Sequence, residues 1–224
     1  MIISTLRRLG AVSAVLSFVA FTASAELVTN GGFDTGDLTG WTAFVTANGT
    51  SGSGLPAVSV FDLGSGASNA AQFDVGAVTC CTLAGGGISQ TITAPEDGTY
   101  QFTAQIASLD DPDGEVNGDG GTFSILVDGV AVATDSLGAF SSPHQVIDGS
   151  LDGSEALTAG AHTLQIQIVR PFTSGGDATP QEFVDNISAN ETASATPEPC
   201  SMSLLAAGGV ALIGLLRRRQ KLSV

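Results

Sequence analysis

The sequence predicts an all-β domain, an antiparallel β-sandwich, between two short terminal segments of different character. Three observations support this fold class. Short runs of alternating apolar and polar residues recur along the chain, clusters of turn residues separate them, and no internal segment has convincing helical spacing. The 29 glycines of the chain suit many turns. About ten short strands of this kind are typical of a sandwich.

The strand predictions follow the alternation in chain order. In the clearest run, Tyr100, Phe102 and Ile106 share one parity, and glutamines and threonines occupy the other. Asp128 and Gly129 separate two further runs and predict a tight hairpin, because both residues tolerate the positive φ that such a turn needs. The predicted strands are 27–29, 41–45, 58–61, 70–74, 88–93, 100–106, 123–127, 130–132, 145–151, 164–168 and 183–188.

The N-terminus has the three parts of a signal peptide. Arg7 and Arg8 form a positive region, residues 11–21 are apolar, and Ala23 and Ala25 fit the small-residue cleavage rule. Cleavage after Ala25 divides the chain into a signal peptide (1–25), a β-sandwich domain (26–190), a spacer with a proline motif (191–199) and a C-terminal hydrophobic helix with a basic tail (200–224). A domain of this length is enough for one core.

The C-terminus reads as a sorting tail. An uncharged, mostly apolar stretch (201–216) lies between a proline motif and a basic cluster, and its length makes it a marginal membrane helix. The flanking residues are Pro197, Glu198, Pro199, Arg217, Arg218 and Arg219. These residues resemble the PEP-CTERM sorting signal of bacterial exported proteins. The resemblance implies cleavage near the triplet by an exosortase-type membrane protease, and Cys200 departs from the small or hydroxyl residue expected there. The alternative is an ordinary C-terminal anchor with its arginines in the cytoplasm.

Charge excludes one class of partner. Six of the seven basic residues lie in the terminal segments, so the chain between them carries all 22 acidic residues and only one basic residue, Arg170. Such a surface repels nucleic acid and anionic lipid. Two interpretations stay open: a solvating shell for an exported protein, or carboxylates that collect divalent cations.

The cysteines do not form a disulfide framework, since Cys200 is in the tail and Cys80 and Cys81 are adjacent. A bridge between neighbours closes a strained ring. A packing or loop role and a vicinal disulfide both stay open for this pair.

The two ends of the domain resemble jelly-roll carbohydrate-binding modules of the galactose-binding-like group. The opening phrase runs from Leu27 through Asn30 to Asp34 and precedes Gly40-Trp41, and the closing phrase is 183–187. The resemblance implies a jelly roll and a structural calcium ion held by Asp34 and Asp185 with backbone carbonyls. By parity with Phe183 and Ile187, Asp185 is expected to point inward, where a carboxylate needs either a cation or hydrogen-bond donors.

A second candidate calcium site lies between two predicted strands. Oxygen-bearing residues at alternate positions resemble the front half of a calcium loop, but its twelfth position is Ser124 and not glutamate. The candidate ligands are Asp111, Asp113, Glu115, Asn117 and Asp119. The alternative is a flexible acidic connection.

Catalytic motifs are sparse. The chain has no nucleophile elbow, zinc-binding helix motif or phosphate-binding glycine loop, and we expect His144 and His162 to be ordinary loop and strand-end residues. We also expect Trp41 and Tyr100 to pack in the core. Phe140, Phe172 and the polar loops are left as candidates to line a ligand site.

The sequence is compatible with three functions. We predict an exported, non-catalytic cell-surface or extracellular-matrix protein, held in the membrane by its C-terminal helix before processing and in contact with extracellular polysaccharide. The alternatives are a dedicated carbohydrate-binding module, which would show an exposed aromatic pair, and a secreted hydrolase, which would need a cleft with an activated nucleophile or a carboxyl group of raised pKa.

Overall fold

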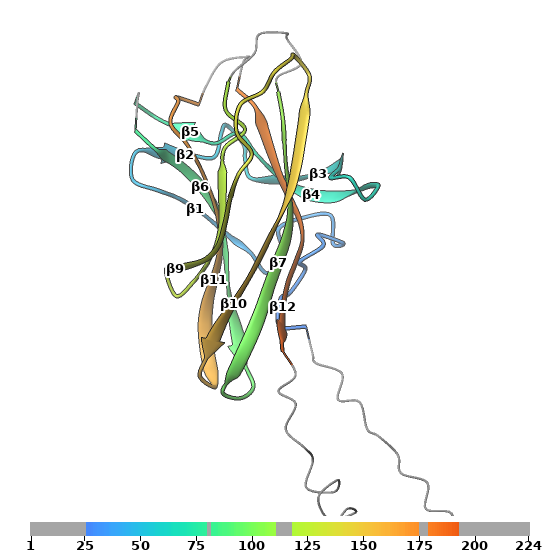
Figure 1. Cartoon of the computed structure of the whole chain (residues 1–224), viewed down its shortest axis with the longest axis vertical. Coiled ribbons are helices and arrows are strands. Elements are labelled where there is room, and N and C mark those ends of the chain that lie inside the picture. Colours follow the sequence, from blue (N-terminus) through green and yellow to red (C-terminus); the bar gives the residue numbers. More distant parts are fainter. Residues whose placement is uncertain (1–25, 80–81, 111–117, 175–178, 193–224) are drawn as a thin grey trace, which may run out of the picture.

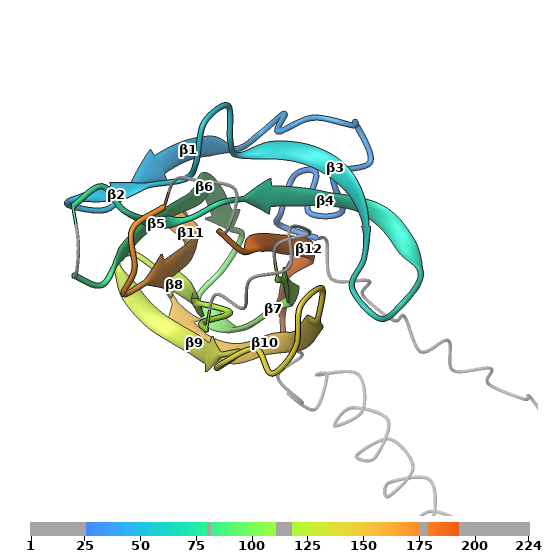
Figure 2. The same cartoon turned by 90° about the horizontal axis from the view of Figure 1, so that it is seen from above.

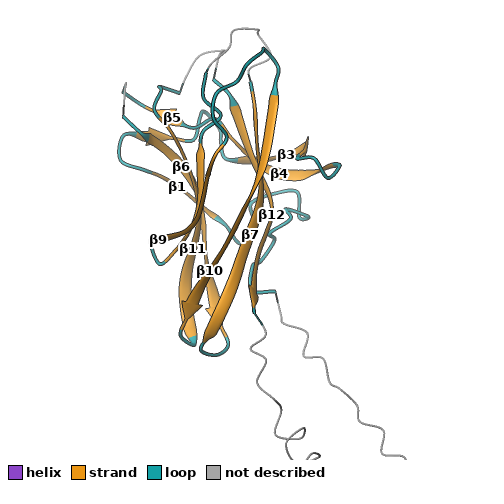
Figure 3. Ribbon diagram, in the orientation of Figure 1, coloured by secondary structure: helices purple, strands orange, loops and turns teal. Residues whose placement is uncertain are grey.

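The computed structural model describes residues 26–79, 82–110, 118–174 and 179–192, and these residues form strands, turns and loops without a helix (Figure 3). Apolar alternation, β-branched residues and glycine-rich connections produce this all-β chain. The strands are β1 (Thr42–Val45), β2 (Gly49–Thr50), β3 (Ala57–Asp62), β4 (Ala67–Phe73), β5 (Gly76–Ala77), β6 (Ala84–Ala94), β7 (Gly98–Leu109), β8 (Thr122–Val127), β9 (Val130–Ser136), β10 (Val146–Leu157), β11 (Gly160–Arg170) and β12 (Gln181–Glu191).

Two five-stranded sheets pack face to face (Figures 1 and 2). The first has the order β1-β6-β11-β8-β9, the second has the order β10-β7-β12-β4-β3, and β2 and β5 form a separate small pair. All strand pairs within the sheets are antiparallel. The predicted antiparallel β-sandwich is therefore confirmed.

Ten of the eleven predicted strands coincide with strands of the structure, and the prediction for 27–29 is wrong. That segment lies beside β12 but joins it through a single ladder-like bond, from Leu27 N to Ala189 O at 3.2 Å. Side chains provide its other bonds: Glu26 Oε1 accepts from Val28 N, and Gln90 Oε1 accepts from Thr29 N. Local alternation cannot distinguish such a segment from a strand.

The predicted hairpin at Asp128 and Gly129 is confirmed. The two residues join β8 to β9 with φ angles of 51° and 81°. Positive φ at both central positions matches the right-handed twist of the flanking strands.

The main core fills the space between the sheets. Alternate residues of the long central strands point into it, and Trp41 and Tyr100 are buried there, as predicted. The largest fully buried apolar side chains are Tyr100, Phe33, Phe73, Phe102, Phe123, Ile88, Ile92, Ile106, Ile125, Leu151 and Leu164.

A bulge in β12 divides its side chains between two clusters. The pairing with β7 shifts between Asp185 and Ser188, so Val184 and Ile187 both face the main core although they are three residues apart. Phe183 packs instead on the outer face of the second sheet, in a smaller cluster. Asp185 shares the face of Phe183 and is 1% exposed, so the expected burial is confirmed, but the expectation that it faces the same way as Ile187 is wrong. The members of the outer cluster are Leu63, Ala70, Ala107 and Phe183, with Phe61 and Leu109 packed against them.

The two sheets close on each other along one side, where edge strands β9 and β10 lie next to each other (Figure 2). A β-carbon on Gly153 of β10 would lie 2.2 Å from Val132 O of β9, so only glycine allows this approach. The backbones of β9 and β10 are therefore in close contact along this side.

Both ends of the described domain lie at one end of the sandwich (Figure 1). Ala189 N donates to Glu26 Oε1 at 2.8 Å, and Thr192 N donates to Thr99 O at 2.8 Å. The signal peptide with Ala23 and Ala25, the tail with its proline motif and arginines, and Cys80 and Cys81 lie outside the described residues. Within the described part of the chain, no helix is both long and apolar enough to cross a membrane.

Candidate functional site

The outer face of the second sheet carries polar side chains on the neighbouring strands β10, β7 and β12. They occupy the positions between the core residues, so they point away from the core. The strand register arranges them in three rows across the sheet: Ser154, Gln101 and Asn190; Asp152, Thr103 and Ser188; and Ser150, Gln105 and Asp185. Hydroxyl, amide and carboxylate groups thus lie side by side over this surface, which we call the polar face; Asp185, at the end of the third row, is only 1% exposed.

Hydrogen bonds between strands hold the side chains of the polar face in place. Thr103 Oγ1 and Ser188 Oγ are 2.8 Å apart, and Gln101 Nε2 donates to Asp152 Oδ1. Gln105 Oε1 accepts from Asn186 Nδ2 at 2.8 Å. Polar groups that are fixed before a ligand arrives lose less entropy when it binds.

The β3–β4 connection lies across one part of this face. Ser65 Oγ donates to Gln105 Oε1 at 3.2 Å, and Leu63 of the same connection is buried. Phe61 and Phe183 stack there with ring centroids 3.7 Å apart and an interplanar angle of 4°. Phe183 is only 2% exposed, so this pair closes the outer cluster and is not an open platform for a sugar.

Asp34 and Asp185, predicted from the resemblance as calcium ligands, are brought together around Gly32. A β-carbon on Gly32 would have Asp34 Oδ2 and Asn186 Oδ1 at 3.8 Å and Asp185 Oδ1 at 4.0 Å. Sequence reasoning missed Asn186, the third of these oxygen-bearing side chains. Phe33 and Asn186, which flank the two aspartates, both have φ of 51°, a left-handed conformation that is uncommon for a bulky residue such as Phe33.

The environment of Asp185 fits both alternatives left open by the sequence. Burial raises the pKa of Asp185, the Ser68 hydroxyl and the Asn186 amide oppose this rise, and the charge of Asp34 adds to it. The two opposing donors lie 2.6 Å from the Asp185 carboxylate. Hydrogen bonds therefore satisfy the carboxylate in the structure, and the oxygen atoms around Gly32 form a cradle with the chemistry that a hard cation prefers.

Metal centres built from several charged ligands are not seen among the described residues, where no group of three or more His, Cys, Asp and Glu side chains is placed to hold an ion. Of the second predicted calcium loop, Asp111, Asp113, Glu115 and Asn117 lie outside the described residues. Asp119 is described, and its Oδ1 accepts from Gly121 N at 2.8 Å. That loop stays a prediction.

A buried arginine–glutamate pair, also missed from the sequence, lies between the sheets at the end away from Glu26 and Thr192. Arg170 and Glu182 are both fully buried, with Arg170 Nε 3.8 Å from Glu182 Oε1. Arg170 Nε donates to Asp119 O at 2.9 Å, and Glu182 Oε2 accepts from Val75 N at 2.9 Å. Burial raises the pKa of Glu182 to about 8, against the opposing charge of Arg170. Arg170 has the inward parity of Ile166 and Ile168, so alternation alone could have placed it in the core.

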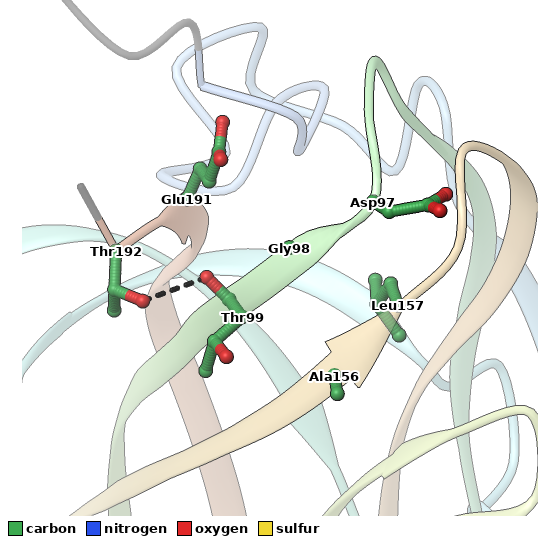
Figure 4. A pocket seen from close by; sticks show the side chains of 7 residues that line it. All are labelled: Asp97, Gly98, Thr99, Ala156, Leu157, Glu191 and Thr192. Carbon is green, nitrogen blue, oxygen red and sulfur yellow. Dashed lines mark hydrogen bonds between the residues drawn. The ribbon is translucent and has the colours of Figure 1, made fainter. Parts of the chain in front are cut away.

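A hollow of about 560 Å³ lies where β12 ends (Figure 4). Asp97, Thr99, Leu157, Glu191 and Thr192 are among the residues that line it. Its polar groups already join strands: Thr192 Oγ1 donates to Thr99 O at 2.8 Å, and Asp97 Oδ1 accepts from Ala159 N at 2.7 Å. We interpret the hollow as the junction that fixes the end of β12.

The two histidines occupy different settings. His162 bridges two turns, with Nδ1 2.7 Å from Asp128 Oδ2 and Nε2 2.8 Å from Thr158 O. These contacts raise the pKa of His162, with the Asp128 hydrogen bond as the largest cause. His144 is exposed in a loop between β9 and β10. The contacts of His162 account for its position without a catalytic role.

Comparisons with known proteins leave the family open. No protein-family model matches the chain, and no curated protein matches it. Among solved structures, the carbohydrate-binding module TmCBM61 with β-1,4-galactotriose has a TM-score of 0.44 and 15% identity, over 75% of this chain and 100% of that one. A cyclase from Fischerella sp. TAU has 0.47 and 16%, over 77% and 100%. The CBM22-1–GH10 modules of a Clostridium thermocellum xylanase have 0.43 and 14%, over 75% and 29%. Scores and identities this low decide neither the fold nor the function of this chain.

Proposed function

We propose that the protein is an exported, non-catalytic β-sandwich of the jelly-roll type that is displayed at the cell surface or in the extracellular matrix and contacts polysaccharide through its polar face. The observation that carries this proposal is the three-row arrangement of hydroxyl, amide and carboxylate side chains across β10, β7 and β12. Sugar hydroxyls both donate and accept hydrogen bonds, so they suit a surface that offers both donors and acceptors.

The position of the chain ends supports display from a tether. Glu26 and Thr192 lie at the same end of the sandwich, so both terminal segments attach to the domain at that end (Figure 1). The sequence of the tail supports sorting by an exosortase-type protease, which would cut near Pro197–Pro199 after the C-terminal helix has held the chain in the membrane.

We also propose a structural calcium ion at the cradle around Gly32. Asp34, Asp185 and Asn186 would hold it, and the ion would supply positive charge between the two aspartates. The cradle joins the opening segment to β12, as does the bond from Ile187 N to Gly31 O at 3.0 Å. In this role the ion stabilises the fold and takes no part in ligand contact.

Affinity electrophoresis of the full-length chain in mild detergent tests the proposed contact. Gels contain galactan, xylan, mannan or dextran as neutral polymers, or pectate as an anionic one. We expect retardation by at least one neutral polymer and its loss in the double variant Q101A/Q105A. The matched control is Q165A/Q167A, which removes two glutamines from the outer face of β11 in the other sheet.

Retardation that both double variants preserve would contradict the role of the polar face, and a wild-type chain that no polymer retards would contradict the proposal as a whole. The second candidate function, a dedicated carbohydrate-binding module, predicts one polymer with a much larger effect than the others. Similar retardation by several polymers favours the matrix protein.

A further inference from the structure

The side of the sandwich opposite the β9–β10 contact contains a cleft of about 260 Å³. Edge strand β1 forms one wall and the connection between β2 and β3 forms the other. The register pairs Ala43 with Ile88 and Val45 with Gly86, which places both β1 residues at positions of inward parity. Val45 is nevertheless 57% exposed, so the inner side of this edge strand is uncovered. The lining residues are Ala43, Phe44, Val45, Thr50, Ser51, Gly52, Leu55 and Pro56.

The cleft differs from the rest of the surface in its chemistry. Five of its eight lining residues are apolar and none is charged, although the whole chain has 22 acidic residues. Glycines of β6 let the lining approach closely: a β-carbon on Gly87 would lie 2.9 Å from Phe44 Cζ, and one on Gly86 would lie 2.1 Å from Ser51 Oγ. Ser51 therefore packs against the inner face of the sheet, and the Phe44 ring, which has the opposite parity, packs against its outer face.

Ser51 has an unsatisfied polar group. The residue is 4% exposed, and its Oγ has no hydrogen-bond partner among the described residues. A buried hydroxyl without a partner costs about 1–3 kcal/mol, so such a group calls for an explanation. Because no hydrogen bond holds this hydroxyl, a side-chain rotation that turned it toward a molecule in the cleft would break none.

We propose that this cleft binds a single neutral sugar ring that carries an apolar substituent, a 6-deoxy methyl group or an acetyl group. The inference rests on the proposed contact with polysaccharide and adds a second, more selective site to it. The volume is below the roughly 300–1,000 Å³ of drug-sized pockets, so it suits one ring and not a chain of rings. The apolar walls take the methyl or acetyl group, and the Ser51 hydroxyl takes one polar atom of the ring.

Saturation-transfer NMR on the full-length chain in mild detergent tests the proposal. The probes are methyl 6-deoxy-β-D-glucopyranoside and methyl N-acetyl-β-D-glucosaminide, with methyl β-D-glucopyranoside as the fully hydroxylated control. We expect the strongest transfer to the methyl or acetyl protons of at least one probe, and a weaker signal from the control. Equal signals from the control, or no signal from either probe, would overturn the inference.

Three variants locate the binding. V45W fills the cleft and should abolish the signal, whereas V130W places the same bulk on β9, the opposite edge strand of the same sheet, and should leave it unchanged. Val130 is 60% exposed, so the two positions are matched. S51A should weaken binding roughly 3- to 10-fold, the value of one hydrogen bond. It should not lower Tm, because it removes an unsatisfied group. A signal that survives V45W would refute the cleft as the site.

The outcomes separate this inference from the proposed function. Retardation on polymer gels that depends on Gln101 and Gln105, without any glycoside signal, would support the polar face as a binding surface and refute the cleft as a binding site. A V45W-sensitive glycoside signal without retardation on any polymer would support the cleft and refute contact through the polar face. Absence of both would refute both.

Discussion

The variant E182Q provides the sharpest test of the electrostatics between the sheets. Burial raises the pKa of Glu182 from 4.5 to about 8, and it outweighs the charge of Arg170, which acts in the opposite direction. Three features agree with a weakened ion pair. Arg170 Nε is 3.8 Å from Glu182 Oε1, its hydrogen bond goes to Asp119 O, and in the described part of the chain Glu182 Oε1 has no hydrogen-bond partner.

The sign of the effect follows from proton binding. Between pH 4.5 and 8 the folded chain holds a proton on Glu182 that the unfolded chain has released, so the free energy of unfolding falls as pH rises. Each pH unit in this window lowers it by about 1.4 kcal/mol, hence by about 3 kcal/mol from pH 4.5 to pH 7. Glutamine does not titrate and keeps a neutral, hydrogen-bonding side chain of the same shape. The stability of E182Q relative to wild type should therefore increase by about 3 kcal/mol over this range.

Urea unfolding at several pH values measures this difference, with the fluorescence of the single tryptophan, Trp41, as the signal. Trp41 is 8% exposed in the core, so unfolding changes its surroundings. If the attraction of Arg170 dominated, Glu182 would be ionised at pH 7 and E182Q would remove the negative charge opposite a buried guanidinium, at a cost of about 3–5 kcal/mol. A variant that is less stable than wild type by a similar amount at every pH would refute the reasoning.

Three further predictions address other parts of the molecule. The pKa of His162 is raised in the folded chain, so its contacts with Asp128 and Thr158 stabilise the fold below pH 6.5. This stabilisation is lost as pH rises through the folded pKa of His162. The drop in Tm between pH 6 and pH 8.5 should therefore be smaller in H162Q than in wild type. G32A should abolish any rise of Tm caused by calcium and leave Tm in chelator unchanged, since its methyl group meets oxygen atoms only at 3.8–4.0 Å; a calcium response that persists would exclude the cradle. G153A should lower stability by about 1–3 kcal/mol in urea unfolding, because its β-carbon would lie 2.2 Å from Val132 O, whereas G118A, with open space around it, should be neutral.

The sequence predicted most of the strands because they obey a local rule. Alternation of apolar and polar residues over β7 and β11 indicates strands with one buried face, and Asp128-Gly129 predicts a turn because both residues tolerate positive φ. The prediction for 27–29 failed because pairing is a property of two segments, and the chain here is held to β12 largely by the side chain of the preceding residue, Glu26.

The candidate sites depended on features that no local pattern carries. Asp34 and Asp185 could be paired only through resemblance to a family, and the participation of Asn186 follows from a bulge that alternation cannot anticipate. The contact between Arg170 and Glu182 joins β11 to β12 in opposite sheets and is fixed by tertiary packing. The rows of the polar face likewise depend on the register between strands.

Strand β12 links these features, and its bulge is what makes the linkage possible. Before the bulge, Glu182 and Val184 point into the sandwich and Asp185 points out toward Ser68; after it, Ile187 returns to the core and Ser188 and Asn190 join the polar face. The third row of that face, Ser150, Gln105 and Asp185, therefore ends at the cradle around Gly32, and Asn186 contacts both the cradle and Gln105. An ion in the cradle that bound Asn186 Oδ1 would fix the orientation of the Asn186 side-chain amide, whose Nδ2 donates to Gln105 Oε1. Calcium should then increase the retardation of the chain by polysaccharide in affinity electrophoresis, through Gln105 and without direct contact between the ion and the ligand. The G32A variant should lose this increase and keep the retardation seen without calcium.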